Sequence, residues 1–166
     1  MTLTDFLDAI EDKAPPAPID QVIALERELT ADLPDDYRRF LIECNGGYVG
    51  GALWFTGPTP DGSAADAGVH HIGGFREEKY FSLPWTRDVY RGRIPHDLLW
   101  IMDDPFGNAI CLAFRGAHRG SIFFWDHERE PERGLWDGAV DSAGNVQILA
   151  RSFTAFVAGL RSTPQN

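Results

Sequence analysis

The segment Leu33-Pro34-Asp35-Asp36-Tyr37-Arg38-Arg39-Phe40-Leu41-Ile42-Glu43-Cys44-Asn45-Gly46-Gly47 has the most clearly marked ends of any segment in this chain. Proline suits the first turn of a helix because its missing N–H would be unpaired there, and the two acids after it face the positive end of the helix dipole. Asn45-Gly46-Gly47 tolerates the left-handed backbone that often ends a helix. Between these ends, apolar residues recur at helical spacing, namely Tyr37, Phe40, Leu41 and Cys44. The segment therefore predicts a short amphipathic helix.

The same spacing predicts further helices on both sides of this segment. One covers Leu3 to Ile10, and a stiff proline-rich connector from Ala14 to Pro18 follows it. A second starts near Ile19, and its apolar stripe is Ile19, Val22, Ile23, Leu25 and Leu29. A short helix is expected from Pro84 to Arg91, with Trp85 and Val89 facing inward. The last begins at Ser152, a good N-cap residue, and should bury Phe153, Phe156, Val157 and Leu160.

Between the helices the pattern becomes extended. Strands are expected over 49–55 and 70–75, with a loop from Gly57 to Gly68 between them, and more strongly over 98–102, 109–114 and 121–125; residues 146–149 suit an edge strand. Short glycine-containing connections between the three strongest strands indicate an antiparallel meander. Helices at both ends with strands between them predict an α+β fold with the sheet built chiefly from residues 98–125. The predicted core includes Tyr37, Phe40, Trp100, Leu112, Phe124 and Phe156.

The 166 residues suit a single domain, with its core over about 19–161 and an N-terminal helix and connector over 1–18. The net charge of −10 argues against direct binding of nucleic acid, which needs clustered lysine and arginine. Residues 1–45 carry eleven acids against four bases, so this part of the chain is the more acidic. Such a surface serves either solubility or the attraction of a basic partner.

Cys44 and Cys111 lie within apolar runs and are expected to be buried free thiols. The N-terminal residues lack the basic and apolar regions of a signal peptide, and no apolar run approaches the ~20 residues that span a bilayer. We therefore expect a reduced, cytoplasmic protein that does not contact membranes.

The motifs of serine hydrolases, P-loop proteins and zinc proteases are missing from the sequence. His70 and His71 should point to opposite faces of a strand, which disfavours a shared metal ion. Asp103, Asp104 and Asn108 resemble half of a calcium loop, but a hairpin turn explains them better. His127 and its acidic neighbours offer a hydrolase alternative, for which a solvated charged loop is the simpler reading. We expect no catalytic residue, no cofactor and no metal.

Residues 19–47 resemble the signature of the SUKH superfamily: a glutamate-containing helix, Leu33-Pro34, two acids, Tyr37, a second helix and Asn45-Gly46-Gly47. Residues 100–112, 120–128 and 152–157 are similar to further blocks of this family, and the order covers about residues 19–161. The resemblance implies an α+β fold with a largely antiparallel sheet. It also implies a non-catalytic protein-binding role: bacterial members are regarded as immunity proteins that neutralise toxins, often nucleases, and fungal SMI/KNR-type members regulate cell-wall glucan synthesis. Residues 1–18 and 57–68 lie outside the signature. They are either elements that determine partner specificity or additions without such a role.

Three functions remain open at this point. The first is an immunity protein that binds a cognate toxin, expected to be a basic nuclease domain, and the second is a regulatory or scaffolding module of the SMI/KNR type. The third is a hydrolase that uses His127. For the first, the candidate partner-binding residues are Glu26, Glu28, Asp35, Asp36, Asp103, Asp104 and, as an apolar anchor, Trp136. The residues lead to no expectation for the oligomeric state.

Overall fold

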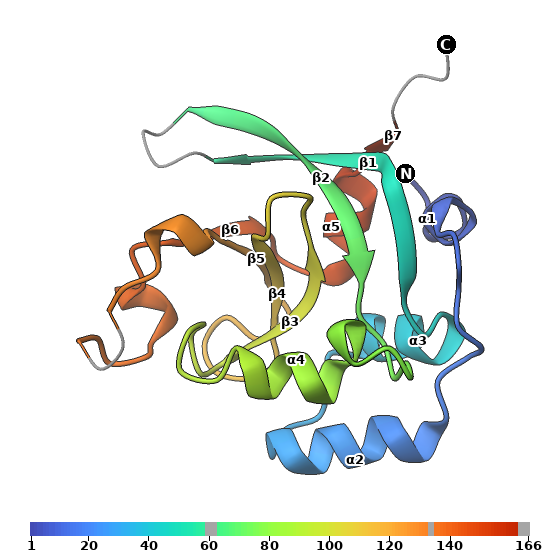
Figure 1. Cartoon of the computed structure of the whole chain (residues 1–166), viewed down its shortest axis with the longest axis horizontal. Coiled ribbons are helices and arrows are strands. Elements are labelled where there is room, and N and C mark those ends of the chain that lie inside the picture. The colour runs from blue at the N-terminus through green and yellow to red at the C-terminus, as the bar shows by residue number, and fades with distance from the viewer. Residues whose placement is uncertain (59–62, 133–134, 163–166) are drawn as a thin grey trace.

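The computed structural model describes residues 1–58, 63–132 and 135–162. Its helices are α1 (Leu3–Ala9), α2 (Ile19–Leu29), α3 (Asp35–Glu43), α4 (Leu83–Val89) and α5 (Phe153–Gly159). Its strands are β1 (Gly47–Pro58), β2 (Ala64–Ile72), β3 (Leu98–Asp103), β4 (Ala109–Ala113), β5 (Ile122–Trp125), β6 (Val146–Ala150) and β7 (Arg161–Ser162). Short 3-10 turns lie at η1 (Lys79–Phe81), η2 (His127–Arg129) and η3 (Val140–Ser142). The α+β prediction is confirmed (Figure 1).

One antiparallel sheet runs through the molecule in the order β6-β5-β4-β3-β2-β1-β7. The predicted meander is present as β3 to β5, and β6 forms one edge as expected. The longest strands are β1 and β2, with 12 and 9 residues, and they form a hairpin that curls over the meander (Figure 1). The prediction that residues 98–125 make most of the sheet was therefore wrong, because this hairpin contributes more strand residues than β3, β4 and β5 together.

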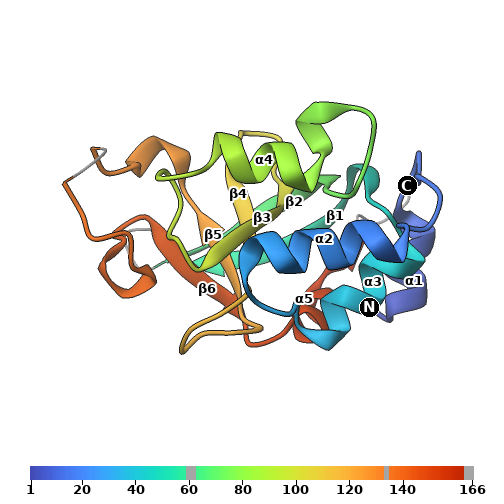
Figure 2. The same cartoon turned by 90° about the horizontal axis from the view of Figure 1, so that it is seen from below.

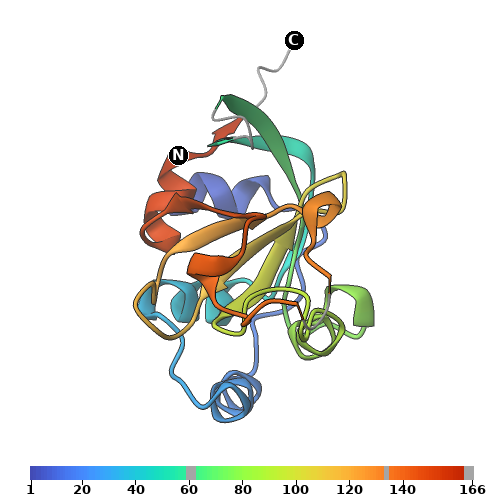
Figure 3. The same ribbon diagram turned by 90° about the vertical axis from the view of Figure 1, so that its left-hand side faces the viewer.

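Hairpin and meander are joined at a narrow seam. The ladder between β2 and β3 consists of the single pair Ile72–Met102, and the Gly73 N–H donates to the Ile101 carbonyl just beyond it. The two halves of the sheet therefore diverge on the other side of Ile72, where β2 rises away from β3 (Figures 1 and 3). At this seam a side chain of β3, that of Asp103, accepts a backbone N–H of β2 in place of a backbone carbonyl.

Two glycine-containing loops interlock below the seam. Asn45 is buried, and its side-chain amide both donates to the Phe75 carbonyl (3.2 Å) and accepts from the Phe75 N–H (2.5 Å). A Cβ on Gly74 would lie 2.2 Å from the Asn45 carbonyl oxygen, and one on Gly46, whose φ is +77°, would lie 2.5 Å from the Ile72 carbonyl oxygen. Only glycine permits such a close approach of two backbones. The Asn-Gly-Gly motif therefore ties the end of α3 to the end of β2.

An aromatic cluster holds three helices together. Phe6 of α1, Tyr37 and Phe40 of α3, and Phe153 of α5 are all buried, and the rings of Phe40 and Phe153 have centroids 4.9 Å apart. Thr2 and Asp5 form a capping box at the start of α1, and the Ser152 side chain caps α5 as expected. The N-terminal helix therefore belongs to the same core as the rest of the chain.

Most of the predicted core residues are buried, including Tyr37, Phe40, Trp100, Leu112 and Phe156. Phe124 is only half-buried, because it lies on the side of β5 that faces the hairpin, with its ring 6.0 Å from that of Phe55.

Two of the predicted helix faces also differ from expectation. Ile19 is 48% exposed because it starts α2 at the surface. In α4 the residues that point inward are Leu83 and Thr86, so the expected inward face of Trp85 and Val89 was wrong: Trp85 is half-buried and Val89 exposed. Helices α2 and α4 run alongside each other (Figure 2), where Glu28 and Arg87 form an ion pair.

Candidate functional site

Two of the predicted partner-binding acids form hydrogen bonds that connect elements of the fold. The Glu26 carboxylate is 10% exposed and accepts hydrogen bonds from the Leu33 N–H (3.0 Å) and from Arg38 Nε (3.1 Å). The Asp36 carboxylate accepts from the Thr154 N–H (2.9 Å) and hydroxyl (3.1 Å) at the start of α5. Glu26 therefore fixes the connection between α2 and α3, and Asp36 joins α3 to α5.

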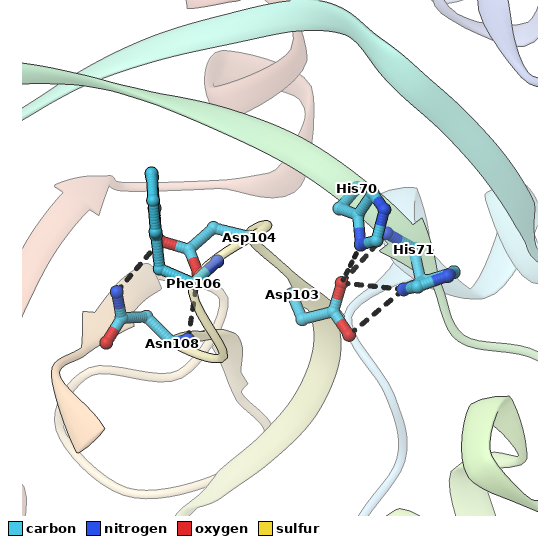
Figure 4. A network of polar contacts seen from close by, with 6 residues as sticks. All are labelled: His70, His71, Asp103, Asp104, Phe106 and Asn108. Atoms are coloured by element: carbon cyan, nitrogen blue, oxygen red, sulfur yellow. Dashed lines mark hydrogen bonds and ion pairs between the residues drawn. The ribbon is translucent and has the colours of Figure 1, made fainter. Parts of the chain in front are cut away.

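Asp104 forms a turn, as the sequence indicated. One carboxylate oxygen accepts from the N–H groups of Phe106 (2.9 Å) and Asn108 (2.8 Å), and the other accepts from the Asn108 side chain (2.8 Å) (Figure 4). Asp104 is only 3% exposed, so its carboxylate serves this turn and is withdrawn from the surface. The hairpin-turn reading of residues 103–108 is confirmed.

The remaining predicted residues do not gather on one surface. Glu28 and Asp35 are exposed at the ends of α2 and α3, whereas Trp136, between η2 and η3, is half-buried and thus partly exposed as predicted. The segment 135–139 lies at the opposite end of the molecule from α3 (Figures 1 and 2). A partner that contacts both regions must therefore span the molecule.

A cluster that the sequence did not predict lies at the seam of the sheet. The Nδ1 atoms of His70 and His71 lie 3.7 Å and 3.1 Å from Oδ1 of Asp103, and the His71 N–H donates to the same oxygen (2.9 Å) (Figure 4). The ring centroids of the two histidines are 3.9 Å apart. The expectation that the two imidazoles point apart was therefore wrong.

The seam explains this arrangement. Since the Asp103 carboxylate accepts the His71 N–H where a neighbouring strand would otherwise supply a carbonyl, it lies at the edge of β2 and not on one of its faces. Side chains from both faces of a strand can lean around its edge toward such a group. This placement depends on the short β2–β3 ladder, for which adjacent histidines give no signal in the sequence.

Aromatic rings surround the cluster and limit its contact with water. Phe81 stacks on His71 with centroids 4.1 Å apart, and the Tyr48 ring lies 5.1 Å from that of His70. Burial raises the pKa of Asp103 to about 6, with a smaller contribution from Asp104. Burial, assisted by the charge of Arg76, lowers the pKa of His71. The two imidazoles and the carboxyl group lie close enough together to bind a cation.

His127 does not form a hydrolytic centre with its neighbours. Its backbone N–H donates to the Asn108 side-chain oxygen (3.1 Å), and its ring Nδ1 lies 2.8 Å from the same atom. A hollow of about 250 Å³ beneath the β1–β2 hairpin is lined by Asp126 and Glu128 but not by His127. The geometry therefore gives the hydrolase alternative no support.

The structure is that of a small α+β protein. The residues that resemble the family signature serve mainly to pack its elements together. The model of the SMI1 / KNR4 family (SUKH-1) matches residues 16–159, and the chain belongs to this family. Proteins of this family are generally non-catalytic immunity or regulatory proteins.

Part of the chain is also similar to a protein of a bacterial prophage. The SPbeta prophage-derived uncharacterized protein YokK of Bacillus subtilis (strain 168) is 31% identical over 84 residues, which are 50% of this chain and 36% of that protein. The chain thus spans little more than a third of the length of this relative.

Among the helices of the described residues, none is both long and apolar enough to cross a bilayer.

Proposed function

We propose that this protein is an immunity protein that neutralises a cognate toxin, a basic nuclease domain, by stoichiometric binding in the cytoplasm. The observation that carries the proposal is the family match over residues 16–159, because bacterial members of this family are regarded as toxin-immunity proteins. The prophage origin in the name of the Bacillus relative fits such a role. The alternative is a regulatory module of the SMI/KNR type, which would bind its partner without silencing a toxin.

The surface charge supports a basic partner. After Glu26, Asp36 and Asp104 are set aside as structural, exposed acids still cover the N-terminal helices and their connections, namely Asp8, Glu11, Asp20, Glu28, Asp32, Asp35 and Glu43. Fields of this kind raise the rate at which an oppositely charged partner is encountered. Asp103 faces the two histidines and is not counted among these acids.

Neutralisation is tested with the product of the neighbouring gene, which this proposal expects to be a large secreted protein with a toxin as its variable C-terminal domain. Expression of that domain alone in a bacterial host should arrest growth, and coexpression with this protein should restore it through a 1:1 complex. A related family member with an unrelated neighbouring toxin serves as the matched control and should not protect. A complex that forms and leaves the toxin fully active would favour the regulatory alternative and contradict this proposal.

The proposed role of the acids is tested by charge reversal. Asp35→Lys should slow association several-fold at low salt, and the on-rate of the unaltered protein should fall as salt rises. Asp66→Lys, which makes the same change in net charge on the exposed β1–β2 hairpin, should leave association within twofold. Stopped-flow or surface-based kinetics measures both. Equal effects of the two variants, or association independent of salt, would show that these acids do not steer the partner.

Trp136 is tested separately because it lies far from α3. As a partly exposed aromatic anchor, it would contribute by filling a pocket on the partner. Trp136→Ala should therefore speed dissociation about thirtyfold, the equivalent of the ~2 kcal/mol that defines a hot spot, with little change in association. An unchanged dissociation rate would show that Trp136 does not contribute to the interface. The exposed acids would then be the remaining proposed contact surface.

A further inference from the structure

We propose that His70, His71 and Asp103 form a binding site for a divalent transition-metal ion, for which zinc is the best match. The proposal replaces the expectation from sequence that no metal binds, because that expectation assumed that the two imidazoles point apart. Each of the three residues offers one ligand atom, and these atoms all lie within 4.8 Å of one another.

The spacing of the ligand atoms suits a tetrahedral ion. Zinc binds imidazole nitrogen and carboxylate oxygen at about 2.0–2.2 Å, so two ligands at a tetrahedral angle lie roughly 3.3 Å apart. The two distances from histidine Nδ1 to Asp103 Oδ1, 3.1 Å and 3.7 Å, fall on either side of this value. The two histidine ligand atoms lie within 4.8 Å of each other, so rotation of the rings would have to close the remaining gap around the ion.

The kind of ligand selects the metal. Two imidazole nitrogens and one carboxylate oxygen suit zinc and its neighbours in the first transition row, whereas calcium and magnesium require oxygen ligands. The side chains of His70, His71 and Asp103 are 29%, 22% and 22% exposed, so an ion held here would keep one side toward solvent. Three protein ligands with a fourth position left for water is the pattern of an open zinc site.

The surroundings hold these ligands in place. The His71 N–H fixes Oδ1 of Asp103, and the Phe81 ring fixes the plane of the His71 imidazole. Such neighbours orient the ligands of established metal sites. The positive charge of Arg76 acts on His71, and ion pairs with Asp12 and Glu78 partly offset that charge.

The test is titration of the chelator-treated, tag-free full chain with zinc chloride near neutral pH by isothermal calorimetry. We expect one equivalent to bind, and His70→Gln to weaken the affinity at least tenfold. His118→Gln is the matched control: His118 Nε2 lies 2.9 Å from Asp141 Oδ1, an imidazole–carboxylate pair that forms no such three-residue group among the described residues. This variant should bind zinc like the unaltered protein.

Two further measurements separate metal binding from folding. Zinc should raise the melting temperature of the unaltered protein and of His118→Gln but not that of His70→Gln, whose circular dichroism should match that of the unaltered protein. Cobalt in place of zinc should give the visible absorption of a tetrahedral ion only when His70 and His71 are both present. Failure to bind zinc at millimolar concentration, or equal affinity of His70→Gln and the unaltered protein, would overturn the proposal.

Discussion

Replacement of Phe40 by alanine should lower the free energy of unfolding by about 3–5 kcal/mol. Phe40 is fully buried, and its ring centroid lies 5.7 Å from that of Phe6, 6.0 Å from that of Tyr37 and 4.9 Å from that of Phe153. The truncation would leave a cavity where α1, α3 and α5 meet, and rigid neighbouring rings cannot collapse to fill it. Urea denaturation followed by tryptophan fluorescence measures the change.

Phe106→Ala is the matched control for this prediction. Phe106 lies in the turn between β3 and β4 and is 75% exposed, so the same truncation should change stability by no more than about 0.5 kcal/mol. Similar losses for the two variants, or a loss below about 1 kcal/mol for Phe40→Ala, would contradict the proposed core. Phe156→Ala should resemble Phe40→Ala, since Phe156 is also buried and its ring lies 5.8 Å from that of Phe55.

Gly46→Ala should be destabilising by about 3 kcal/mol or more. Two costs combine at this position: the positive φ of +77°, which costs an L-residue about 1–2 kcal/mol, and overlap of the new Cβ with the Ile72 carbonyl oxygen at 2.5 Å. The overlap involves backbone on both sides, so relief requires α3 and β2 to separate. The consequence should reach the His70–His71–Asp103 cluster, because its two histidines directly precede Ile72.

Gly92→Ala isolates the first of these two costs. Its φ is +74°, but a Cβ there would meet nothing within 4 Å, so the expected loss is about 1 kcal/mol. The difference between the two variants, measured by thermal or chemical unfolding, reports the close approach of the two loops. Equal losses would mean that Gly46 is required for its backbone angle alone and that the loops are not tightly packed.

The elements with strong local signals could be predicted from sequence. Helix α3 has marked ends, and β3, β4 and β5 are runs of apolar residues separated by short turns. The β1–β2 hairpin was underestimated: residues 57–68 are rich in glycine, alanine and proline and were expected to be a loop, yet Gly57 pairs with Ala65 and Pro58 with Ala64. Ala64, Ala65 and Asp66 at the start of β2 are small or polar and all exposed, so the sequence there lacks the alternation that marks a strand.

The candidate site was less predictable than the fold, because it depends on contacts between distant residues. Whether an acid is free or structural is decided by neighbours such as Thr154, which lies 118 residues from its partner Asp36. The cluster of His70, His71 and Asp103 likewise depends on how few residues pair between β2 and β3. The alternation of apolar and polar residues predicts which face of a strand each side chain occupies. It does not predict where a neighbouring strand stops pairing with that strand.

The interlocked loops at Asn45-Gly46 and Gly73-Gly74 bear on how this protein can diversify. The motif that marks the family is used to bring two backbones together, so its side chains are withdrawn from solvent and from any partner. Proteins that share this motif are therefore free to present different surfaces to their partners, because the motif itself contacts only the interior of the fold. If the exposed acids of the N-terminal helices contact the partner as proposed, substitutions there can change specificity without disturbing the interlocked loops.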